Sequence, residues 1–243
     1  MSGIVDMVTN FGIDRTRRVD WGVETLLAIM REHDVERAYT CSLRAVHYAG
    51  PEGNGETLRV CREHDILRPV AVLDPRRFFD QQDEARRCFV LGFRVFRFFP
   101  DVQGWPLDFL PFVKICETLA ELGARVIVPA ARYGEATQVA RLLGNLDLPV
   151  LLIGGGYANI GELMAVLADY DTMHCDAHMQ DGPFALEGLM ERGGDDRVIF
   201  GSNSPERELL APLMMARHAE LTDAQRRGYL RDNALTFLGE DTR

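Results

Sequence analysis

Three patterns are missing from this sequence, and each absence excludes a class of protein. No apolar run approaches the roughly 20 residues that a helix needs to span a bilayer, so we expect no membrane partner. Acidic residues outnumber basic ones by 37 to 27, which gives a net charge of −10. No basic stripe is present to neutralise phosphates, so we expect no nucleic-acid partner either.

Paired cysteines are also missing. The five cysteines are odd in number and far apart, and no CxxC pair indicates zinc or redox chemistry. The sequence shows no leader of charged and then apolar residues, the pattern that would indicate secretion. These absences predict a cytoplasmic protein with reduced thiols.

What the sequence does contain is a regular alternation of short apolar runs and longer amphipathic stretches. The composition, 47% hydrophobic and 26% charged, is ordinary for a globular protein. Runs of four to six apolar residues predict strands. The predicted strands are Ile4–Val8, Ala38–Ser42, Pro69–Leu73, Phe93–Phe98, Arg125–Val128, Val150–Ile153, Thr172–Cys175 and Val198–Gly201.

Helical patterns lie between these strands and after the last one. The predicted helices are Gly22–His33, Gly55–His64, Phe79–Leu91, Leu107–Leu122, Glu135–Leu143, Ile160–Ala168, Phe184–Arg192, Glu206–Ala219, Asp223–Arg231 and Asn233–Leu238. Eight strand–helix units in 243 residues predict an α/β fold, a single (β/α)8 TIM barrel that spans residues 1–243 as one domain. An open doubly wound sheet is the alternative, but no GxGxxG turn follows the first strand.

Several strand-end motifs carry a family resemblance. They are Val5–Gly12 (VDMVTNFG), Pro69–Arg76 (PVAVLDPR), Gly92–Pro100 (GFRVFRFFP), Val198–Pro205 (VIFGSNSP) and the C-terminal pair Asn233-Ala234. Together they resemble the amidohydrolase-related family, whose first strand reads Asp-x-His-x-His and whose eighth ends Gly-Ser-Asp-x-Pro. The resemblance implies a barrel with its active site at the carboxyl ends of the strands.

The resemblance also implies a divalent metal, and here the sequence departs from the family. The positions of the two first-strand histidines are Val8 and Asn10, and the eighth-strand aspartate is Asn203. The ligand positions of strands five and six fall on Pro129 and Gly154. Val, Pro and Gly side chains offer no lone pair, and a neutral amide binds zinc poorly. The sequence therefore predicts no metal site and no cofactor.

Arg97, His178 and Asn203 are the predicted catalytic residues. Period-2 alternation points Arg97 into the barrel, where its permanent charge needs an anion. That anion is either a substrate carboxylate or an internal partner; the candidate partners are Asp6, Asp74 and Asp176. His178 follows strand seven and is the candidate acid or base.

Other polar residues at the strand ends are predicted to bind substrate: Asn10, His47, Tyr48, Arg132 and Asp176. Arg132 has an alternative interpretation as a solvated loop arginine. The run His174, Asp176 and His178 offers a relocated metal site as a further interpretation. Gly154-Gly155-Gly156 is weak evidence for a phosphate-binding turn, and close backbone approach or loop flexibility is favoured.

Three functional interpretations follow. The first is a metal-independent hydrolase of the lactonase type, or a lyase, acting on a small anionic molecule; the resemblance supports it, since metal-independent lactone hydrolysis occurs in the wider superfamily. The second is a non-catalytic relative, a pseudoenzyme that binds a ligand or a protein partner. The third is a metal hydrolase with relocated ligands. A homo-oligomer is compatible with each.

Overall fold

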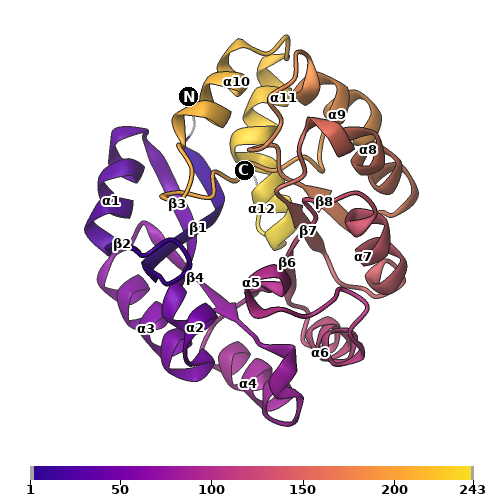
Figure 1. Ribbon diagram of the computed structural model, residues 1–243. Helices are drawn as coiled ribbons and strands as arrows, with labels where there is room; N and C mark the ends of the chain where they lie inside the picture. Colours follow the sequence, from indigo (N-terminus) through magenta and orange to yellow (C-terminus); the bar gives the residue numbers. More distant parts are fainter. Residues whose placement is uncertain (1–2, 242–243) are drawn as a thin grey trace.

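The protein is a barrel of strands inside a ring of helices, described by a computed structural model over residues 3–241 (Figure 1). Within these residues eight strands form one sheet in the order β2-β1-β3-β4-β5-β6-β7-β8, and only the β1–β2 pair is antiparallel. The strands are β1 (Ile4–Asp14), β2 (Val19–Trp21), β3 (Val35–Ser42), β4 (Leu67–Val72), β5 (Val95–Arg97), β6 (Arg125–Pro129), β7 (Val150–Ile153) and β8 (Met173–Cys175). The α/β barrel prediction is confirmed.

The segment of residues 198–204 closes the barrel between β8 and β1. It contains the predicted eighth strand, Val198–Gly201, but the structure has only single bridges here, at Val198 and at Ser204, in place of a regular strand. The Ile199 amide donates to the Cys175 carbonyl of β8 at 2.8 Å. On the other side, the Asn203 amide donates to the Val8 carbonyl of β1 at 2.8 Å. Pairing on both sides makes the sheet continuous around the barrel.

The helices cover the outside of the strands, mostly where the sequence predicts them. They are α1 (Val23–Glu32), α2 (Leu43–His47), α3 (Gly50–Glu63), α4 (Phe78–Val90), α5 (Pro100–Gln103), α6 (Leu110–Glu121), α7 (Glu135–Leu143), α8 (Ile160–Asp169), α9 (Ala185–Gly193), α10 (Leu210–His218), α11 (Asp223–Arg227) and α12 (Asn233–Leu238). A π-helical turn, η3 (Gly228–Asp232), joins the last two. Among the described residues no helix is long and apolar enough to cross a membrane.

Two apolar layers meet at the strands and decide which side chains reach the interior. Phe96 and Phe98 pack in the layer between the strands and the helices. Val95 packs in the second layer, inside the barrel. Because side chains alternate along a strand, Arg97 faces the interior like Val95, at the carboxyl end of β5.

The start of the chain differs from the prediction. The first strand was expected to end at Val8, but β1 continues to Asp14, and β2 turns back and pairs with it. The Asp14 carboxylate fixes the turn, since its Oδ1 accepts the amides of Thr16 (2.7 Å) and Arg17 (3.0 Å). The protein therefore has a hairpin on the carboxyl side of the barrel that strand periodicity did not predict.

Two short helices were also missed. The Ser42 hydroxyl accepts the Arg44 amide at 3.1 Å and begins α2 directly after β3. Pro100 begins α5, and only Phe98 and Phe99 separate it from β5. Both helices lie in strand-to-helix connections and are too short for an apolar period to show. The predicted helix start at Asp223 is confirmed, and the preceding Thr222 forms a reciprocal capping box with Gln225.

Candidate active site

A cavity of about 330 Å³ lies at the carboxyl ends of the strands, and we call it the mouth cavity. Its volume suits a small molecule. One part of its wall is polar: Asn10, Asp14, His47, Arg97, His178 and Asn203. The other part is largely apolar: Leu43, Val46, Phe99, Val102, Pro129, Ile153 and Met179. Five of the predicted site residues line this cavity: Asn10, His47, Arg97, His178 and Asn203.

Arg97 is a buried cation on this wall. The residue is 6% exposed, and its Nη2 donates to the Asn203 Oδ1 at 3.1 Å. The guanidinium lies over the Phe99 ring, 4.6 Å from the ring centre. Its Nε and Nη1 have no hydrogen-bond partner among the described residues. Arg97 forms no ion pair with any described residue. Because a guanidinium cannot lose its charge, the group is a buried cation without a counter-ion in the described part of the chain.

The three carboxylates considered as internal partners of Arg97 are engaged elsewhere. Asp6 accepts the Ser202 hydroxyl at 2.5 Å, and Asp74 forms an ion pair with Arg76 at 2.7 Å. Asp176 binds His178. The interpretation of Arg97 as half of an internal ion pair is therefore wrong for all three candidates.

His178 and Asp176 form a hydrogen-bonded pair beside the mouth cavity. The His178 Nδ1 lies 2.5 Å from the Asp176 Oδ2, and the histidine side chain is 5% exposed. An ionised carboxylate only accepts, so Nδ1 carries the proton and Nε2 is left for a ligand. Burial lowers the pKa of His178, but the charge and hydrogen bond of Asp176 outweigh it, and the net pKa is raised above 6.5.

The glycine turn after β7 holds Asp176 in place. The Gly154 amide donates to the Asp176 Oδ1 at 3.0 Å, from a left-handed backbone with φ of 79°. A side chain at Gly155 would meet Leu163 at 2.7 Å. The interpretation favoured from the sequence, close backbone approach, is what the turn shows. Its amide binds a carboxylate of the chain itself rather than a phosphate.

A second buried carboxylate, Asp6, supports Asn203 from below. Its Oδ1 accepts the amides of Val8 (3.1 Å) and Ser202 (3.0 Å), which fixes the segment that contains Asn203. Asn203 itself has φ of 57°, a left-handed conformation that asparagine tolerates. Burial raises the pKa of Asp6 to about 6, against the hydrogen bonds from Ser202 and Val8. The Asn10 Oδ1 is also buried, and it has no hydrogen-bond partner among the described residues.

The rim of the mouth cavity includes residues that sequence reasoning missed. Asp14 lies 3.7 Å from the His47 Nε2, and Arg17 forms an ion pair with Glu206 across the opening. Burial lowers the pKa of His47, although the nearby Asp14 raises it. The signal that could have found Asp14 and Arg17 is the Asp-x-Thr-Arg turn pattern, which lies between the first predicted strand and the first predicted helix.

Three predicted substrate-binding residues are corrected by their positions. Tyr48 is 58% exposed and lines a different hollow, because α2 carries it outward. Arg132 is exposed and forms an ion pair with Asp101 at 2.7 Å, as expected of a solvated loop arginine. Asp176 is fully buried behind His178 and orients that ring instead of lining the cavity.

The relocated metal site is also corrected. His174 packs edge-on against Phe237 of α12, with ring centres 5.0 Å apart, and burial lowers its pKa to about 4. It therefore does not join Asp176 and His178. Nowhere in residues 3–241 do three His, Cys, Asp or Glu side chains form a group that could hold a metal ion.

The cavity positions at which the family resemblance implies metal ligands do not fit a divalent metal, and the carboxylates and imidazoles elsewhere on the wall form no group of three within the described residues. Asn10, Pro129, Gly154 and Asn203 line the cavity, and none supplies an imidazole or a carboxylate. The Asn203 oxygen is already bound to Arg97, a cation, which a metal ion would repel. Amide and backbone oxygens alone are a poor set for zinc.

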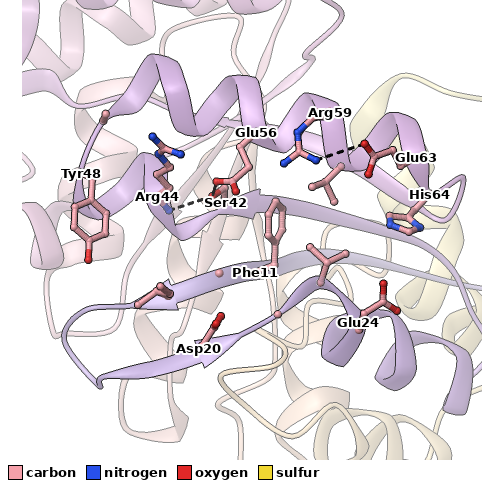
Figure 2. A pocket seen from close by; sticks show the side chains of 16 residues that line it. Phe11, Asp20, Glu24, Ser42, Arg44, Tyr48, Glu56, Arg59, Glu63 and His64 are labelled. Atoms are coloured by element: carbon pink, nitrogen blue, oxygen red, sulfur yellow. Dashed lines mark hydrogen bonds and ion pairs between the residues drawn. The ribbon is translucent and has the colours of Figure 1, made fainter.

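A larger hollow of about 740 Å³ lies outside the barrel, and we call it the outer trough (Figure 2). Figure 2 shows the β1–β2 hairpin and α1 along one side and α2 and α3 along the other. Its lining includes Phe11, Ile13, Asp20, Glu24, Ser42, Arg44, Tyr48, Glu56, Arg59, Glu63 and His64. Its charges are mostly exposed, and its buried Ser42 hydroxyl already donates to Glu56 at 2.7 Å. Although larger, it contains no buried group that lacks a partner among the described residues.

The fold is similar to that of solved decarboxylases. A 2,6-dihydroxybenzoate decarboxylase from Rhizobium matches with a TM-score of 0.77 at 15% identity, covering 98% of this chain and 99% of its own. A 5-carboxyvanillate decarboxylase from Novosphingobium aromaticivorans, solved with bound manganese, matches with a TM-score of 0.74 at 12% identity, covering 98% and 97%. A dihydroxybenzoic acid decarboxylase from Polaromonas, also solved with bound manganese, matches with a TM-score of 0.76 at 14% identity, covering 98% of this chain and 97% of its own. At these identities the likeness is one of fold.

Sequence comparison is more specific. No curated protein matches the chain. The sequence model of the amidohydrolase family, however, matches residues 54–239, well over half of the chain. This match confirms the resemblance inferred from the strand-end motifs. The chain therefore belongs to the amidohydrolase family.

Proposed function

We propose that this protein binds a small anionic molecule in the mouth cavity and hydrolyses it without a metal, as a lactonase-type enzyme. The observation that carries the proposal is Arg97, a buried guanidinium with two unpartnered nitrogens and no carboxylate beside it among the described residues. A buried, permanent charge is costly unless an anion compensates it. A substrate carboxylate supplies that anion and matches the planar guanidinium.

The His178–Asp176 pair supplies the proton transfer. In lactone hydrolysis, the His178 Nε2 takes a proton from water as the oxygen adds to the ring carbonyl carbon. The ring C–O bond then breaks, and the same nitrogen returns the proton to the leaving alkoxide, which gives a hydroxy acid. Asp176 holds the ring in the required tautomer through the 2.5 Å hydrogen bond.

Asn203 and Asn10 would orient the substrate. The Asn203 oxygen is bound to Arg97, so its amide nitrogen is the group available to donate to a developing oxyanion. The Asn10 Oδ1 is a buried acceptor without a partner among the described residues. His47, on the same wall, is available as a further polar contact.

A lyase reaction is the second candidate, and the solved neighbours favour it. Several of them are decarboxylases of small aromatic acids. In that reaction a C–C bond breaks, carbon dioxide leaves, and the electron pair stays on carbon until protonated His178 donates to it. The raised pKa of His178 supports such an acid. Two of those neighbours hold manganese, whereas the side chains here do not fit it.

The first test is anion binding, measured by thermal melts with small mono- and dicarboxylates. The parent protein should be stabilised by about 3 kcal/mol at a ligand concentration of 100 Kd. Arg97→Met should lose this shift and fold about as stably as the parent, because no carboxylate is left without its cation. Arg44→Met, a matched change in the outer trough, should keep the shift. A destabilisation of about 3–5 kcal/mol in Arg97→Met, with no shift in the parent, would mean that Arg97 serves a hidden ion pair.

The second test is turnover of carboxylate-bearing lactones and aromatic acids, with and without a chelator. The proposal requires hydrolysis that survives the chelator, together with no stoichiometric divalent metal by elemental analysis. Release of carbon dioxide without lactone hydrolysis would favour the lyase. Binding with no turnover of either class would favour a non-catalytic relative, and about one zinc or manganese per chain would contradict the metal-free chemistry.

A further inference from the structure

The hairpin that links β1 to β2 is strongly basic, and it lies directly beside an acidic hollow. Its turn contains Arg15, Arg17 and Arg18, and we call it the basic hairpin. The outer trough contains four carboxylates, on Asp20, Glu24, Glu56 and Glu63, against two arginines. Opposite charges thus lie side by side on one surface.

Several of these charges have no ion-pair partner in the part of the chain that the structure describes. Among the described residues, neither Arg15 nor Arg18 forms an ion pair, although Arg15 lies 5.8 Å from the Tyr48 ring centre. Asp20 and Glu24 likewise form no ion pair there, whereas Glu63 binds Arg59. Free cations on the hairpin and free carboxylates in the trough are suited to pair with each other between molecules.

The same surface exposes apolar side chains. Ile13 is 54% exposed, Val19 40% and Tyr48 58%, although each is large. A second hollow of about 490 Å³, lined by these three residues and by Arg15, Arg18 and Asp20, shares Ile13, Asp20 and Tyr48 with the outer trough. Figure 2 shows Tyr48 at one end of the trough and Glu24 and His64 at the other. The apolar patch therefore continues from the hairpin into the trough.

We propose that this surface binds a second copy of the chain, with the basic hairpin of each copy seated in the outer trough of the other. The contact is its own complement under a two-fold axis, because each copy presents one basic hairpin and one acidic trough. Arg15 and Arg18 face the carboxylates of the partner copy, and Ile13, Val19 and Tyr48 pack between them. In this arrangement Tyr48 contacts the second copy of the chain and does not bind substrate.

The trough differs from a small-molecule site in the way its polar groups are satisfied. Within the described chain, no buried side-chain atom of its lining lacks a hydrogen bond. A buried orphan group aimed into a hollow would indicate a small ligand, as Arg97 does in the mouth cavity. Exposed charges around apolar side chains are typical of the rim and centre of a protein interface.

The test is the mass in solution, measured by sedimentation velocity at several concentrations and at low and high salt. The parent should be a dimer at low salt, and 1 M NaCl should weaken it by at least tenfold, because exposed charge pairs are screened. Arg15→Glu with Arg18→Glu should be monomeric, and so should Glu24→Lys with Glu63→Lys. Arg86→Glu with Arg141→Glu, on α4 and α7, carries the same change in charge as the hairpin variant and should remain a dimer.

Mixing the two monomeric variants gives the decisive result. Each acidic hairpin then meets a basic trough, and each basic hairpin meets an acidic trough, so the mixture should form a heterodimer. This rescue also shows that both variants are folded. A parent that stays monomeric at every concentration, or a dimer that neither pair of changes weakens, would overturn the proposal. A mixture that stays monomeric although both variants keep the parent's thermal stability would overturn it too.

Discussion

The mouth cavity and the outer trough differ in volume, but the more informative difference is how deeply each one buries its charged side chains. The trough is the larger, at about 740 Å³ against 330 Å³. Its Arg44 is exposed, whereas Arg97 in the mouth cavity is 6% exposed and has two nitrogens without a hydrogen-bond partner among the described residues. Burial removes water from Arg97 and leaves its charge uncompensated, while water solvates Arg44. This difference is why we propose the smaller hollow as the ligand site.

The strongest way to break this comparison is to change one histidine in each hollow. His178→Asn should reduce turnover by about 10²–10⁴-fold, because Asn can bind Asp176 but cannot exchange a proton. Anion binding, read by thermal shift, should remain. His64→Asn in the outer trough should leave turnover unchanged. An equal loss of turnover in the two variants would mean that His178 takes no part in proton transfer.

The buried carboxylate beneath Asn203 makes a prediction about pH. The pKa of Asp6 is raised from 3.8 to about 6, so folding favours its protonated form. Its contribution to stability is fully present below about pH 4 and is lost as the pH rises through about 6. The difference corresponds to roughly 3 kcal/mol as an upper bound.

Asp6→Asn removes this titration while it keeps an oxygen for the amides of Val8 and Ser202. Relative to the parent, the variant should gain stability between pH 4 and pH 7. Urea unfolding of both proteins at each pH measures the gain. A constant difference at every pH would show that Asp6 does not titrate in this range.

Two glycines with similar backbones sharpen the comparison further. Gly154 (φ 79°) supports Asp176 beside the mouth cavity, and Gly12 (φ 101°) lines the outer trough. A Cβ has room at each, with the nearest atom at 3.8 Å, so Ala should cost about 1–2 kcal/mol of backbone strain at both. Only Gly154→Ala should also lower turnover, through Asp176. Equal activities in the two variants would show that the turn does not position Asp176.

The smallest effect is expected at the exposed ion pair of the trough. Arg59 and Glu63 lie 3.5 Å apart on α3, and both side chains are more than half exposed. Glu63→Gln should change the free energy of unfolding by about 0.3–0.5 kcal/mol, and less at high salt. A loss above 1 kcal/mol in unfolding curves would mean that the trough is less solvated than its exposure indicates.

The sequence predicted the barrel well because its signals are local. The spacing of apolar residues that indicates a strand or a helix can be read from a few neighbouring residues. The structure accordingly has three elements at their predicted bounds: Val150–Ile153, Glu135–Leu143 and Asn233–Leu238. The inward direction of Arg97 followed from the same alternation. Local periodicity does not indicate which residues distant in sequence form hydrogen bonds with each other. The hydrogen bond from Arg97 to Asn203, which spans 106 positions, could therefore not be predicted.

The predicted site failed where a short local turn redirected a side chain. His47 and Tyr48 are neighbours at the end of α2, yet His47 lines the mouth cavity and Tyr48 the outer trough. A helix of five residues is below the length at which apolar period can be read. The hairpin was missed for a related reason, since β2 has three residues and pairs through a turn set by Asp14.

The closing segment of the barrel has a consequence for the order of folding. Asp6 binds Ser202 across 196 positions of sequence, and this bond lies directly under Asn203 and Arg97. Contacts of such long range form late, since the chain must first lose the entropy of closing a very long loop. The mouth cavity of a nascent chain therefore stays incomplete until this segment has left the ribosome. During refolding, anion binding should appear only after most of the helical signal has returned.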